Sequence, residues 1–532
     1  MTRDQIKKDL AEAVKKLGAE VGDVEVTRND NPDFGDFSTN LALKISHGLS
    51  QSPMETAKIL TDSLKNQSYV LKLEVKEPGF INFFLKPEVW QKQVADVLEQ
   101  NQAYGSNKSG EGKKARVEFI SANPTGPLHF GNARGGPIGD VLALILEFNG
   151  YEVLREYYHN DVGGQIEKLG ESILNIQKGK KLEDQEYKGK YIEELAEKVG
   201  DVKSSQEAGK KAVELIFDEI KEDTRAMGID FDEYYTESDL LKNGATQEVL
   251  EKVKRFLKEK DGAIWFAPSD EFLKDRETVV KKSDGSYTYF ANDIAYHNIK
   301  FEGGADLVAD VMGSNHHGHV PRLKAAISAL GYDVSRFHVI LYQWVRFKRG
   351  GKLVKMSKRS GTFVTAREVL DEIGPDALRF FILMHDANSP IDFDLDLASK
   401  KSRENPVYYV QYAHARIASI IDKATRLDSG QARMTGGGVD YELLTTNYEL
   451  NLIRQIAKLP KLVDEISRSF AVHRLTAYAM ELADSFHKFY ENCPVISKDS
   501  DLQNARIDLV KSAKIALGNT LGLLGVSAPE KM

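Results

Sequence analysis

The most constraining feature of this sequence is the segment 116–140, RVEFISANPTGPLHFGNARGGPIGD. It begins as a short strand ending at Ser121, passes through a Gly- and Pro-rich turn, and runs into an apolar stretch (residues 131–148) that predicts a helix. A strand, a tight turn and a helix N-terminus form a natural anion site, because unpaired amide groups and the positive end of the helix dipole face the same crevice. The segment therefore predicts a nucleotide-binding α/β domain.

The turn contains the tetrapeptide His129-Phe130-Gly131-Asn132. Gly131 has no β-carbon, so a nucleotide can approach the backbone closely. The side chains of His129 and Asn132 can donate hydrogen bonds to phosphate oxygens. Taken alone, the tetrapeptide is better explained as a helix cap in an ordinary α/β core, because short motifs often match by chance.

A second motif, Lys355-Met356-Ser357-Lys358-Arg359, follows the last expected strand. The two motifs, in this order, are similar to the HxGH and KMSKS motifs of class I aminoacyl-tRNA synthetases. The surrounding words, ANPTGPLHFGNARGGPIGDVLA and KMSKRSGTFVTAREVLDEIGPDALRFF, resemble the arginyl-tRNA synthetase family. The resemblance runs from PGFINF (residues 78–83) to the C-terminal LLGVSAPEKM, and it implies an arginine–tRNA ligase.

Length and composition limit the alternatives. At 532 residues the chain is too long for a single hydrophobic core. No apolar run approaches the roughly 20 residues that span a bilayer, so no membrane association is expected. Cys493 is the only cysteine, which excludes an intrachain disulfide and a thiolate zinc cluster and fits a cytoplasmic protein. The net charge of −8 argues against a protein that merely coats nucleic acid, and the resemblance implies a monomer.

Periodicity and turn residues divide the chain into three regions. We expect a small α+β domain over residues 1–105, a Rossmann-like parallel-sheet catalytic domain with a helical insertion (about 165–260) over 115–390, and an all-α helix bundle over 391–532. The Gly-, Ser- and Lys-rich stretch 101–114 predicts a linker. Further expectations are a helical run over 40–64, a hairpin over 277–291, a last strand over 339–345, and helix breaks at Gly374-Pro375 and Pro460.

The resemblance implies that ATP is held between the two motifs. The residues concerned are Pro127, His129, Gly131 and Asn132 on one side, and Lys355, Met356, Ser357 and Lys358 on the other. Negative charge grows on the phosphoryl oxygens as pyrophosphate leaves, so His129, Asn132, Lys355 and Lys358 are the candidate catalytic groups. Asn132 stands where the family has a second histidine; its amide can donate a hydrogen bond but cannot become cationic. Mg²⁺ is expected to arrive with the ATP, bound through phosphates and water.

A guanidinium is a planar fork of donors that carboxylates and aromatic rings recognise. Tyr289 and Asp293 match the positions of the family's arginine side-chain pocket, and Glu118 is a plausible second acid. The resemblance assigns Ser121 and Asn123 to the α-amino and carboxylate ends of arginine, and Asn315 to the loop that closes the pocket. For a single acid, a surface ion pair remains the alternative explanation.

Candidate contacts with tRNA(Arg) lie at both ends of the chain: Phe34, Tyr408, Tyr412, Arg416 and Met532. Aromatic rings interleaved with cations suit unpaired bases, whereas core packing is the alternative for any ring among them. His316-His317-Gly318-His319 invites a zinc interpretation, but three histidines of one loop do not converge readily on one ion. The cations of residues 346–359 could bind an anion or form a solvated loop.

Two other functions share these motifs. A different adenylyltransferase could use the same crevice, but it would not need the helical C-terminal region. A catalytically silent RNA-binding paralogue would not need His129, Lys355 and Lys358. The resemblance also implies that tRNA must be bound before arginine is activated, and that the acyl group passes to the 2′-hydroxyl of the terminal ribose.

Overall fold

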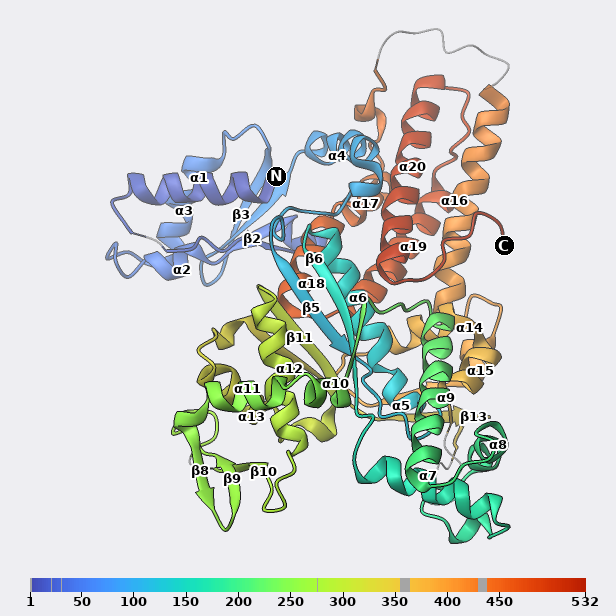
Figure 1. The fold of residues 1–532 in the computed structure, drawn as a ribbon. Coiled ribbons are helices and arrows are strands. Elements are labelled where there is room, and N and C mark those ends of the chain that lie inside the picture. Colours follow the sequence, from blue (N-terminus) through green and yellow to red (C-terminus); the bar gives the residue numbers. More distant parts are fainter. Residues whose placement is uncertain (1, 21, 30, 275, 355–363, 429–437) are drawn as a thin grey trace. The chain divides into compact units, whose positions relative to one another are not determined.

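The computed structural model describes residues 2–20, 22–29, 31–274, 276–354, 364–428 and 438–532 (Figure 1). The chain divides into two compact units. Unit 1 comprises residues 1–101, 420–457 and 485–513, and unit 2 comprises residues 102–419, 458–484 and 514–532. Among the described residues, no helix is both long and apolar enough to cross a membrane.

Unit 2 is built on a five-stranded parallel sheet in the order β12-β11-β5-β6-β7. Its strands are β5 (Lys114–Phe119), β6 (Glu152–His159), β7 (Glu233–Thr236), β11 (Leu307–Gly313) and β12 (Phe337–Tyr342). The carboxyl ends of parallel strands meet at one edge, which is where ligands bind in such sheets. The turn after β5, which contains the first motif, lies at that edge, so the predicted α/β class is confirmed.

The alternation of side chains along β5 decides what lies on each face of the sheet. Phe119 packs against α6 (Gly135–Phe148), where a β-carbon added to Gly139 would come within 2.3 Å of the Phe119 ring. Glu118 points to the opposite face, where Lys300 of α12 (Tyr289–Glu302) contacts it. An apolar helix therefore covers one face, while a helix bearing polar side chains covers the other (Figure 1).

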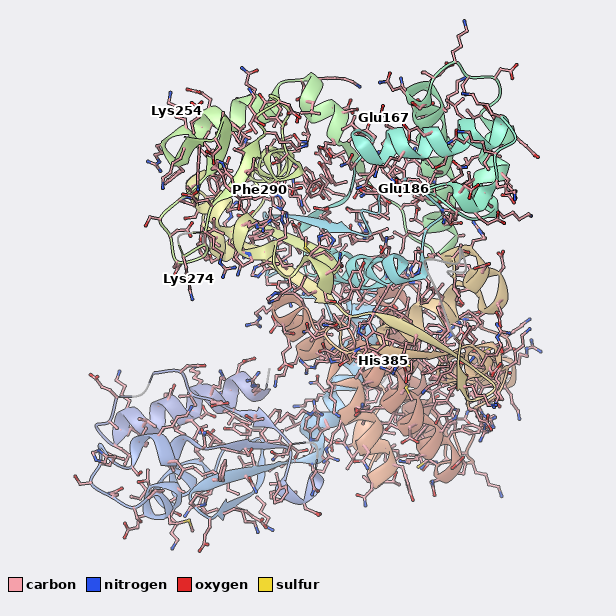
Figure 2. The ribbon with its side chains drawn as sticks, turned by 90° about the horizontal axis from the view of Figure 1, so that it is seen from below. Glu167, Glu186, Lys254, Lys274, Phe290 and His385 are labelled. Carbon is pink, nitrogen blue, oxygen red and sulfur yellow. The ribbon has the colours of Figure 1, made fainter. Side chains whose placement is uncertain are left out.

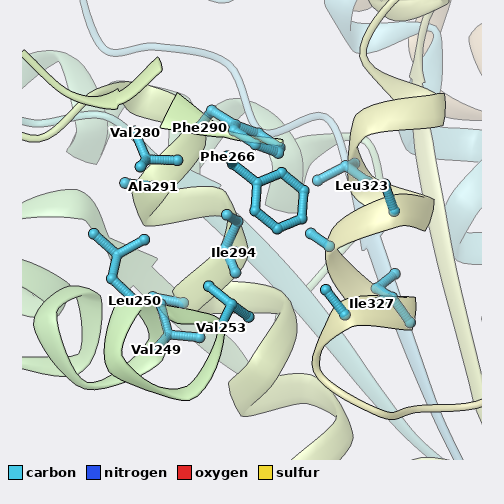
Figure 3. Packing of buried hydrophobic residues seen from close by; sticks show 14 of the residues in the cluster. Val249, Leu250, Val253, Phe266, Val280, Phe290, Ala291, Ile294, Leu323 and Ile327 are labelled. Atoms are coloured by element: carbon cyan, nitrogen blue, oxygen red, sulfur yellow. The ribbon is translucent and has the colours of Figure 1, made fainter. Parts of the chain in front are cut away.

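The core of the second face is an apolar cluster between α12, α13 (Val320–Ala329) and a small antiparallel sheet, β10-β9-β8 (Figure 3). Phe266, Phe290 and Ile294 belong to this cluster, and Leu323 and Ile327 come from α13 (Figure 3). Phe290 is also labelled in the side-chain view (Figure 2). The strands of the small sheet are β8 (Leu257–Lys260), β9 (Ala263–Phe266) and β10 (Thr278–Lys281). This cluster fixes α12 and thereby the candidate residues Tyr289 and Asp293.

The other elements of unit 2 complete the expected insertion and the second motif's surroundings. They are α5 (Phe130–Ala133), α7 (Gly164–Gln177), α8 (Lys190–Lys198), α9 (Ser205–Ala226), α10 (Glu237–Lys242), α11 (Ala245–Lys252), η5 (Ser314–His316), β13 (Val345–Arg349), β14 (Lys352–Leu353), α14 (Ala366–Leu383), β15 (Ile391–Asp394), α15 (Leu395–Ser399) and α18 (Leu459–Ser469). Residues 164–226 are largely helical, but β7 belongs to the main parallel sheet, so the expected extent of the helical insertion (about 165–260) was too long at its C-terminal end. Helix α9 buries an apolar stripe of Val213, Ile216, Phe217 and Ile220.

Unit 1 combines a four-stranded sheet, in the order β1-β2-β4-β3, with helices. Its elements are α1 (Thr2–Lys16), β1 (Thr27–Arg28), β2 (Phe37–Thr39), α2 (Leu41–Ile45), α3 (Pro53–Leu64), β3 (Val70–Lys76), β4 (Phe80–Leu85), α4 (Pro87–Gln100) and α17 (Asn447–Ile456). Three further helices contribute residues to both units: α16 (Pro406–Asp428), α19 (Arg474–Asn492) and α20 (Ser500–Leu523). The α+β character of the N-terminal region is therefore confirmed.

Several local expectations hold and others are wrong. Helix α14 bends at Gly374, and α18 begins beside Pro460, as predicted. The run over 40–64 is two helices, because Ser52 caps the second one in a capping box with Glu55 and Pro53 starts it. The stretch 101–114 is not a free linker: Tyr104 is buried, and its carbonyl oxygen accepts a hydrogen bond from Asn519.

Two strand predictions also need correction. The expected hairpin over 277–291 reduces to a single bridge between Lys281 and Tyr287, because its second arm starts α12 and β10 pairs with β9 instead. The expected last strand over 339–345 is two strands in different sheets, since β13 pairs in parallel with β15. The first cations of the basic segment therefore lie on a strand. Arg346 and Lys348 contact Asp392, and Arg349 contacts Glu372, so this part is not a loop of isolated charges.

Candidate active site

The turn after β5 is held in an unusual backbone conformation. Ile120 and Ser121 have φ values of 67° and 41°, a left-handed region that residues with a side chain rarely occupy. The next residue, Ala122, is clamped at both its amide N and its carbonyl O by the hydroxyl of Tyr157 on β6, at 3.0 and 2.9 Å. Strain of this kind persists only where the surroundings enforce it, and it concentrates at functional sites.

Ser121 links this turn to Glu118. Its hydroxyl donates to a carboxylate oxygen of Glu118 at 2.8 Å and accepts from the amide of Tyr158 at 3.1 Å. Asn123, two residues further on, is exposed at the mouth of the turn. Both residues that the sequence assigns to the ends of the amino acid therefore lie at the carboxyl end of β5.

His129 caps the N-terminus of α5. The amide of Gly131 donates to Nδ1 of His129 at 2.8 Å, and a β-carbon on Gly131 would lie 2.8 Å from the same atom. A side chain at position 131 would therefore displace the imidazole, so this glycine is required for the cap as well as for access by a ligand. Asn132 is exposed on the first turn, and Pro127 is half-buried before it.

The residues that follow the second motif lie beside His129. Backbone hydrogen bonds join the amide of Phe130 to the carbonyl of Val364 at 3.1 Å, and the amide of Ala366 to the carbonyl of Leu128 at 2.8 Å. Between them, His129 and Thr365 form an antiparallel bridge. Thr365 in turn caps α14 in a capping box with Glu368. Two segments more than two hundred residues apart thus meet at the first motif; Lys355, Met356, Ser357 and Lys358 themselves lie outside the described residues.

The buried guanidinium of Arg134 fastens the first motif to the segment after β12. It donates to the carbonyl oxygens of Gln343 at 2.6 Å, Ser389 at 2.8 Å and Asp386 at 3.1 Å. Burial lowers the pKa of Arg134 to about 10, which leaves it protonated at neutral pH. A fully buried cation that is satisfied mainly by carbonyl oxygens acts as a fixed brace rather than as a ligand for substrate.

A second group of side chains gathers over the start of α12. Tyr289 is 44% exposed, whereas Asp293, one helical turn later, is only 4% exposed. Asp293 is the first cause of a strongly raised pKa at Tyr289, and it also raises the pKa of Tyr158 on β6, where burial is the larger cause. Nε2 of His319 lies 2.9 Å from Oδ2 of Asp293. The two residues predicted for the guanidinium pocket are therefore adjacent, and a histidine from the HHGH segment contacts the acid.

Glu237 is a neighbour that the sequence did not reveal. It starts α10, is buried, and accepts a hydrogen bond from Asn292, the residue before Asp293. Burial raises the pKa of Glu237 to about 7, with Asp293 adding to the rise. In the sequence, Glu237 directly follows Thr236, and a threonine followed by an acid is the usual start of a helix. The pattern therefore gave no reason to expect a binding residue.

Beneath this pocket the sheet carries a row of acids at one register. Asp310 of β11 pairs with Glu118 of β5, which pairs with Glu156 of β6. Nζ of Lys300 bridges Glu118 and Asp310 at 2.5 and 2.7 Å, while Arg116 contacts Glu156 at 2.5 Å. Three carboxylates thus lie beside two permanent cations, and His297 lies 2.9 Å from one of these acids, Asp310.

The protonation of this row follows from its contacts. Burial raises the pKa of Glu118, although the ammonium of Lys300 opposes the rise. Burial also works to raise the pKa of Asp310, but Lys300 and His297 overcome it and lower that pKa. Nε2 of His297 donates to the carboxylate of Asp310 at 2.9 Å, and this contact raises the pKa of His297 against the effect of burial. Burial likewise raises the pKa of Glu156, so Asp310 is the acid of the row whose pKa its partners lower.

The remaining predicted residues lie on η5 and the turn that follows it, the segment that also carries His319. Asn315 is exposed on η5, where its side chain covers Gly313: a β-carbon there would come within 2.6 Å of the Asn315 amide oxygen. Of the HHGH histidines, His316 is half-buried with a pKa lowered by burial, and His317 is exposed. Among the described residues, no three His, Cys, Asp or Glu side chains are arranged to hold a metal ion.

The predicted tRNA contacts have mixed surroundings. On α16, Tyr408 and Tyr412 are half-buried, and the guanidinium of Arg416 donates to the Tyr412 hydroxyl at 2.7 Å. The chain end lies along the same helix, where Nδ1 of His414 is 2.9 Å from the carbonyl oxygen of Pro529. In its own unit Phe34 is exposed, and Met532 is exposed at the C-terminus.

Sequence models of three families together match most of the chain. The arginyl tRNA synthetase N-terminal domain matches residues 4–85, the class I (R) tRNA synthetase catalytic domain matches residues 93–386, and the DALR anticodon binding domain matches residues 410–532. The catalytic model alone spans more than half of the sequence. The chain belongs to the arginyl-tRNA synthetase family. The resemblance seen in the two motifs is therefore confirmed.

Curated relatives agree over the full length. An arginine–tRNA ligase of Geobacter sp. (strain M21) is 42% identical, over 96% of this chain and 96% of the relative. One of Bacillus licheniformis is 38% identical, over 100% of this chain and 99% of the relative. The family assignment therefore does not depend on the two motifs alone.

Solved structures show the same architecture. A putative arginyl-tRNA synthetase from Campylobacter jejuni matches with a TM-score of 0.74 and 30% identity, over 84% of this chain and 100% of that chain. The Thermus thermophilus arginyl-tRNA synthetase matches with a TM-score of 0.77 over the whole of both chains; at 23% identity it supports the fold alone. The expected combination of an α+β region, a Rossmann-like catalytic domain and a C-terminal helical region is confirmed.

Proposed function

We propose that this protein is an arginine–tRNA ligase that works in two steps. The carboxylate of L-arginine attacks the α-phosphorus of ATP, pyrophosphate leaves, and arginyl-adenylate forms. The 2′-hydroxyl of the terminal ribose of tRNA(Arg) then attacks the arginyl carbonyl carbon, and AMP leaves. The observation that carries the proposal is the pairing of the first motif with the residues that follow the second, at the carboxyl edge of the parallel sheet.

This pairing supports a shared triphosphate site. Pro127, His129, Gly131 and Asn132 would line one side of ATP, and Mg²⁺ would enter bound to the phosphates. The His129–Thr365 bridge brings the residues that follow the second motif beside the first, and Lys355, Met356, Ser357 and Lys358 belong to the second motif itself. We assign them, from the sequence, to the opposite side of the triphosphate. Asn132 would donate a neutral hydrogen bond, so cationic stabilisation of the leaving group would come from the lysines.

The pocket over α12 supports arginine as the amino acid. Asp293, Glu237 and the ring of Tyr289 offer carboxylates and an aromatic face to a planar cation. Ser121 and Asn123 would hold its α-amino and carboxylate ends, with Glu118 beneath them. Asn315 would close the pocket from η5. An uncharged analogue would offer these buried carboxylates no opposite charge, which is why such a pocket would discriminate strongly.

Both terminal regions of the chain would bind tRNA. We assign residues 1–105 to a domain that contacts tRNA, residues 115–390 to catalysis and residues 391–532 to anticodon binding. Exposed Phe34 supports the first assignment, and Tyr408, Tyr412, Arg416 and Met532 are our candidates for the last. We further propose a cytoplasmic monomer; a sedimentation experiment on the purified chain tests the oligomeric state.

Arginine-dependent exchange of pyrophosphate into ATP tests the function directly. We expect exchange with arginine and not with lysine or citrulline, and we expect bound tRNA(Arg) to be required for it. Formation of acid-stable arginyl-tRNA tests the second step. If neither exchange nor aminoacylation occurs under any of these conditions while tRNA still binds, the protein is an RNA-binding paralogue and the proposal is wrong.

A further inference from the structure

Trp344 is conspicuously exposed for a tryptophan. The chain has three tryptophans: Trp90 is 4% exposed, Trp265 is half-buried, and Trp344 is 51% exposed. Trp344 follows the end of β12 by two residues, so it stands at the carboxyl edge of the parallel sheet, where the first motif also lies. A large ring left in water at the ligand edge of a sheet marks a surface that another molecule can cover.

The backbone at Trp344 is fixed to the first motif. The guanidinium of Arg134, which directly follows α5, donates to the carbonyl of Gln343 at 2.6 Å. The amide of Ile391 donates to the carbonyl of Trp344 at 3.1 Å, which ties it to β15. The ring therefore projects from a braced backbone, a few residues from the nucleotide site.

A guanidinium lies over the ring. The guanidinium of Arg346 lies 4.7 Å from the centre of the Trp344 ring. Arg346 and Lys348 both contact the carboxylate of Asp392, at 2.7 and 3.0 Å. Leu353, which is exposed, pairs with Lys348 across the β13–β14 hairpin and extends the apolar part of the surface.

We propose that Trp344, with Arg346 beside it, is a stacking platform for the unpaired nucleotides at the 3′ end of the RNA. The inference rests on the proposed function and adds the surface that receives this end. An aromatic ring next to a guanidinium suits unpaired bases, because every base offers a π-face and the backbone brings negative charge. A duplex hides these faces, so a paired stem fits the surface less well. The terminal ribose must reach the nucleotide site, and Arg134 joins that site to Trp344.

Intrinsic fluorescence tests the contact. Full-length protein is titrated with tRNA(Arg), either intact or lacking its unpaired 3′ nucleotides, while filter retention measures binding. We expect intact tRNA to quench the fluorescence and trimmed tRNA to bind without that quenching. In the Trp344→Ala protein, the two RNAs should no longer differ in how much they quench. Equal quenching by both RNAs, or a difference that persists in Trp344→Ala, would overturn the platform. If tRNA(Arg) does not bind at all, the proposed function itself fails.

Steady-state kinetics provides a second test. Trp344→Ala is expected to raise the KM for tRNA about tenfold, the size expected when one base loses its aromatic partner, with the KM for arginine and ATP unchanged. Trp344→Phe should recover most of the loss. The matched control is Trp265→Ala, since Trp265 also carries a cation over its ring, with Lys260 at 5.5 Å. An equal effect at position 265, or an equal rise in the KM for all three substrates, would show general damage and contradict the platform.

Discussion

Replacing Asp293 by Asn removes one negative charge from the proposed guanidinium pocket while keeping the size of the side chain. The carboxylate is 4% exposed, so water screens it poorly. A charge pair about 4 Å apart is worth about 4 kcal/mol at an effective dielectric constant of about 20. In the free protein His319 lies 2.9 Å from the same carboxylate and must give up part of that contact, which reduces the net gain. We therefore expect a loss of about 3 kcal/mol, or roughly a 100-fold fall in kcat/KM for arginine.

The assay is arginine-dependent pyrophosphate exchange at saturating ATP and tRNA, with tRNA affinity measured separately. The fall in kcat/KM should appear when arginine is the varied substrate. The affinity for tRNA should stay within twofold of that of the unmodified protein. Asp284→Asn is the matched control, because Asp284 is an exposed acid on the turn that precedes α12. An Asp293→Asn protein with unchanged kinetics for arginine would remove this residue from the pocket and refute the reasoning.

Three further predictions concern buried charges. The pKa of Glu237 is raised to about 7, so its carboxylate is neutral below that pH and ionised above it; the KM for arginine should fall as pH rises from 6 to 8, and Glu237→Gln should flatten that profile. A pH profile identical in both proteins would contradict the assignment. Lys300→Met leaves Glu118 and Asp310 without their shared cation, so the free energy of unfolding should fall by about 3–5 kcal/mol. We expect a lower melting temperature for this variant, and Lys300→Arg should recover part of the loss. Arg379 is fully buried and bonds Asp140 and the carbonyl of Leu524, so Arg379→Met should lower the melting temperature and speed limited proteolysis near the C-terminus; unchanged cleavage would argue against this role.

The direction of the Glu237 effect on stability follows from the same pKa. Its folded-state pKa lies above the ordinary value for a glutamate, so between about pH 4.5 and 7 the folded protein holds a proton that the unfolded chain has lost. The contribution of Glu237 to stability therefore falls as pH rises through this window and is constant above it. Glu237→Gln should make thermal unfolding less dependent on pH over that range.

Local sequence patterns accounted for much of the architecture. The strand, turn and helix around the first motif, the stripe on α9 and the breaks at Gly374 and Pro460 all depend on residues close together in the chain. Backbone preferences and apolar periodicity act over such short distances, so they can be recognised in the sequence. The boundary at Ser52 was missed although Gly48, the capping box of Ser52 and Glu55, and Pro53 all mark it in the sequence.

Strand partners were harder to predict, because pairing joins residues that are distant in sequence. The residues 339–345 have the composition of one strand, yet β12 and β13 belong to different sheets. Likewise, the basic residues of β13 looked unopposed, since Asp392 and Glu372 lie more than twenty residues further along the chain. Charge patterns within one segment do not reveal the acids that another segment brings to it.

The sequence by itself determined the family, the nucleotide-binding edge after the first strand of the sheet, and the pair Tyr289 and Asp293 on one helical turn. Only the tertiary structure decided that Asp310, Glu118 and Glu156 stand in register beneath that pair, that Glu237 joins it, and that Trp344 is exposed above a braced backbone. Parallel strands set such registers through hydrogen bonds between segments far apart in the chain, and a helix on one face then selects which side chains are buried together.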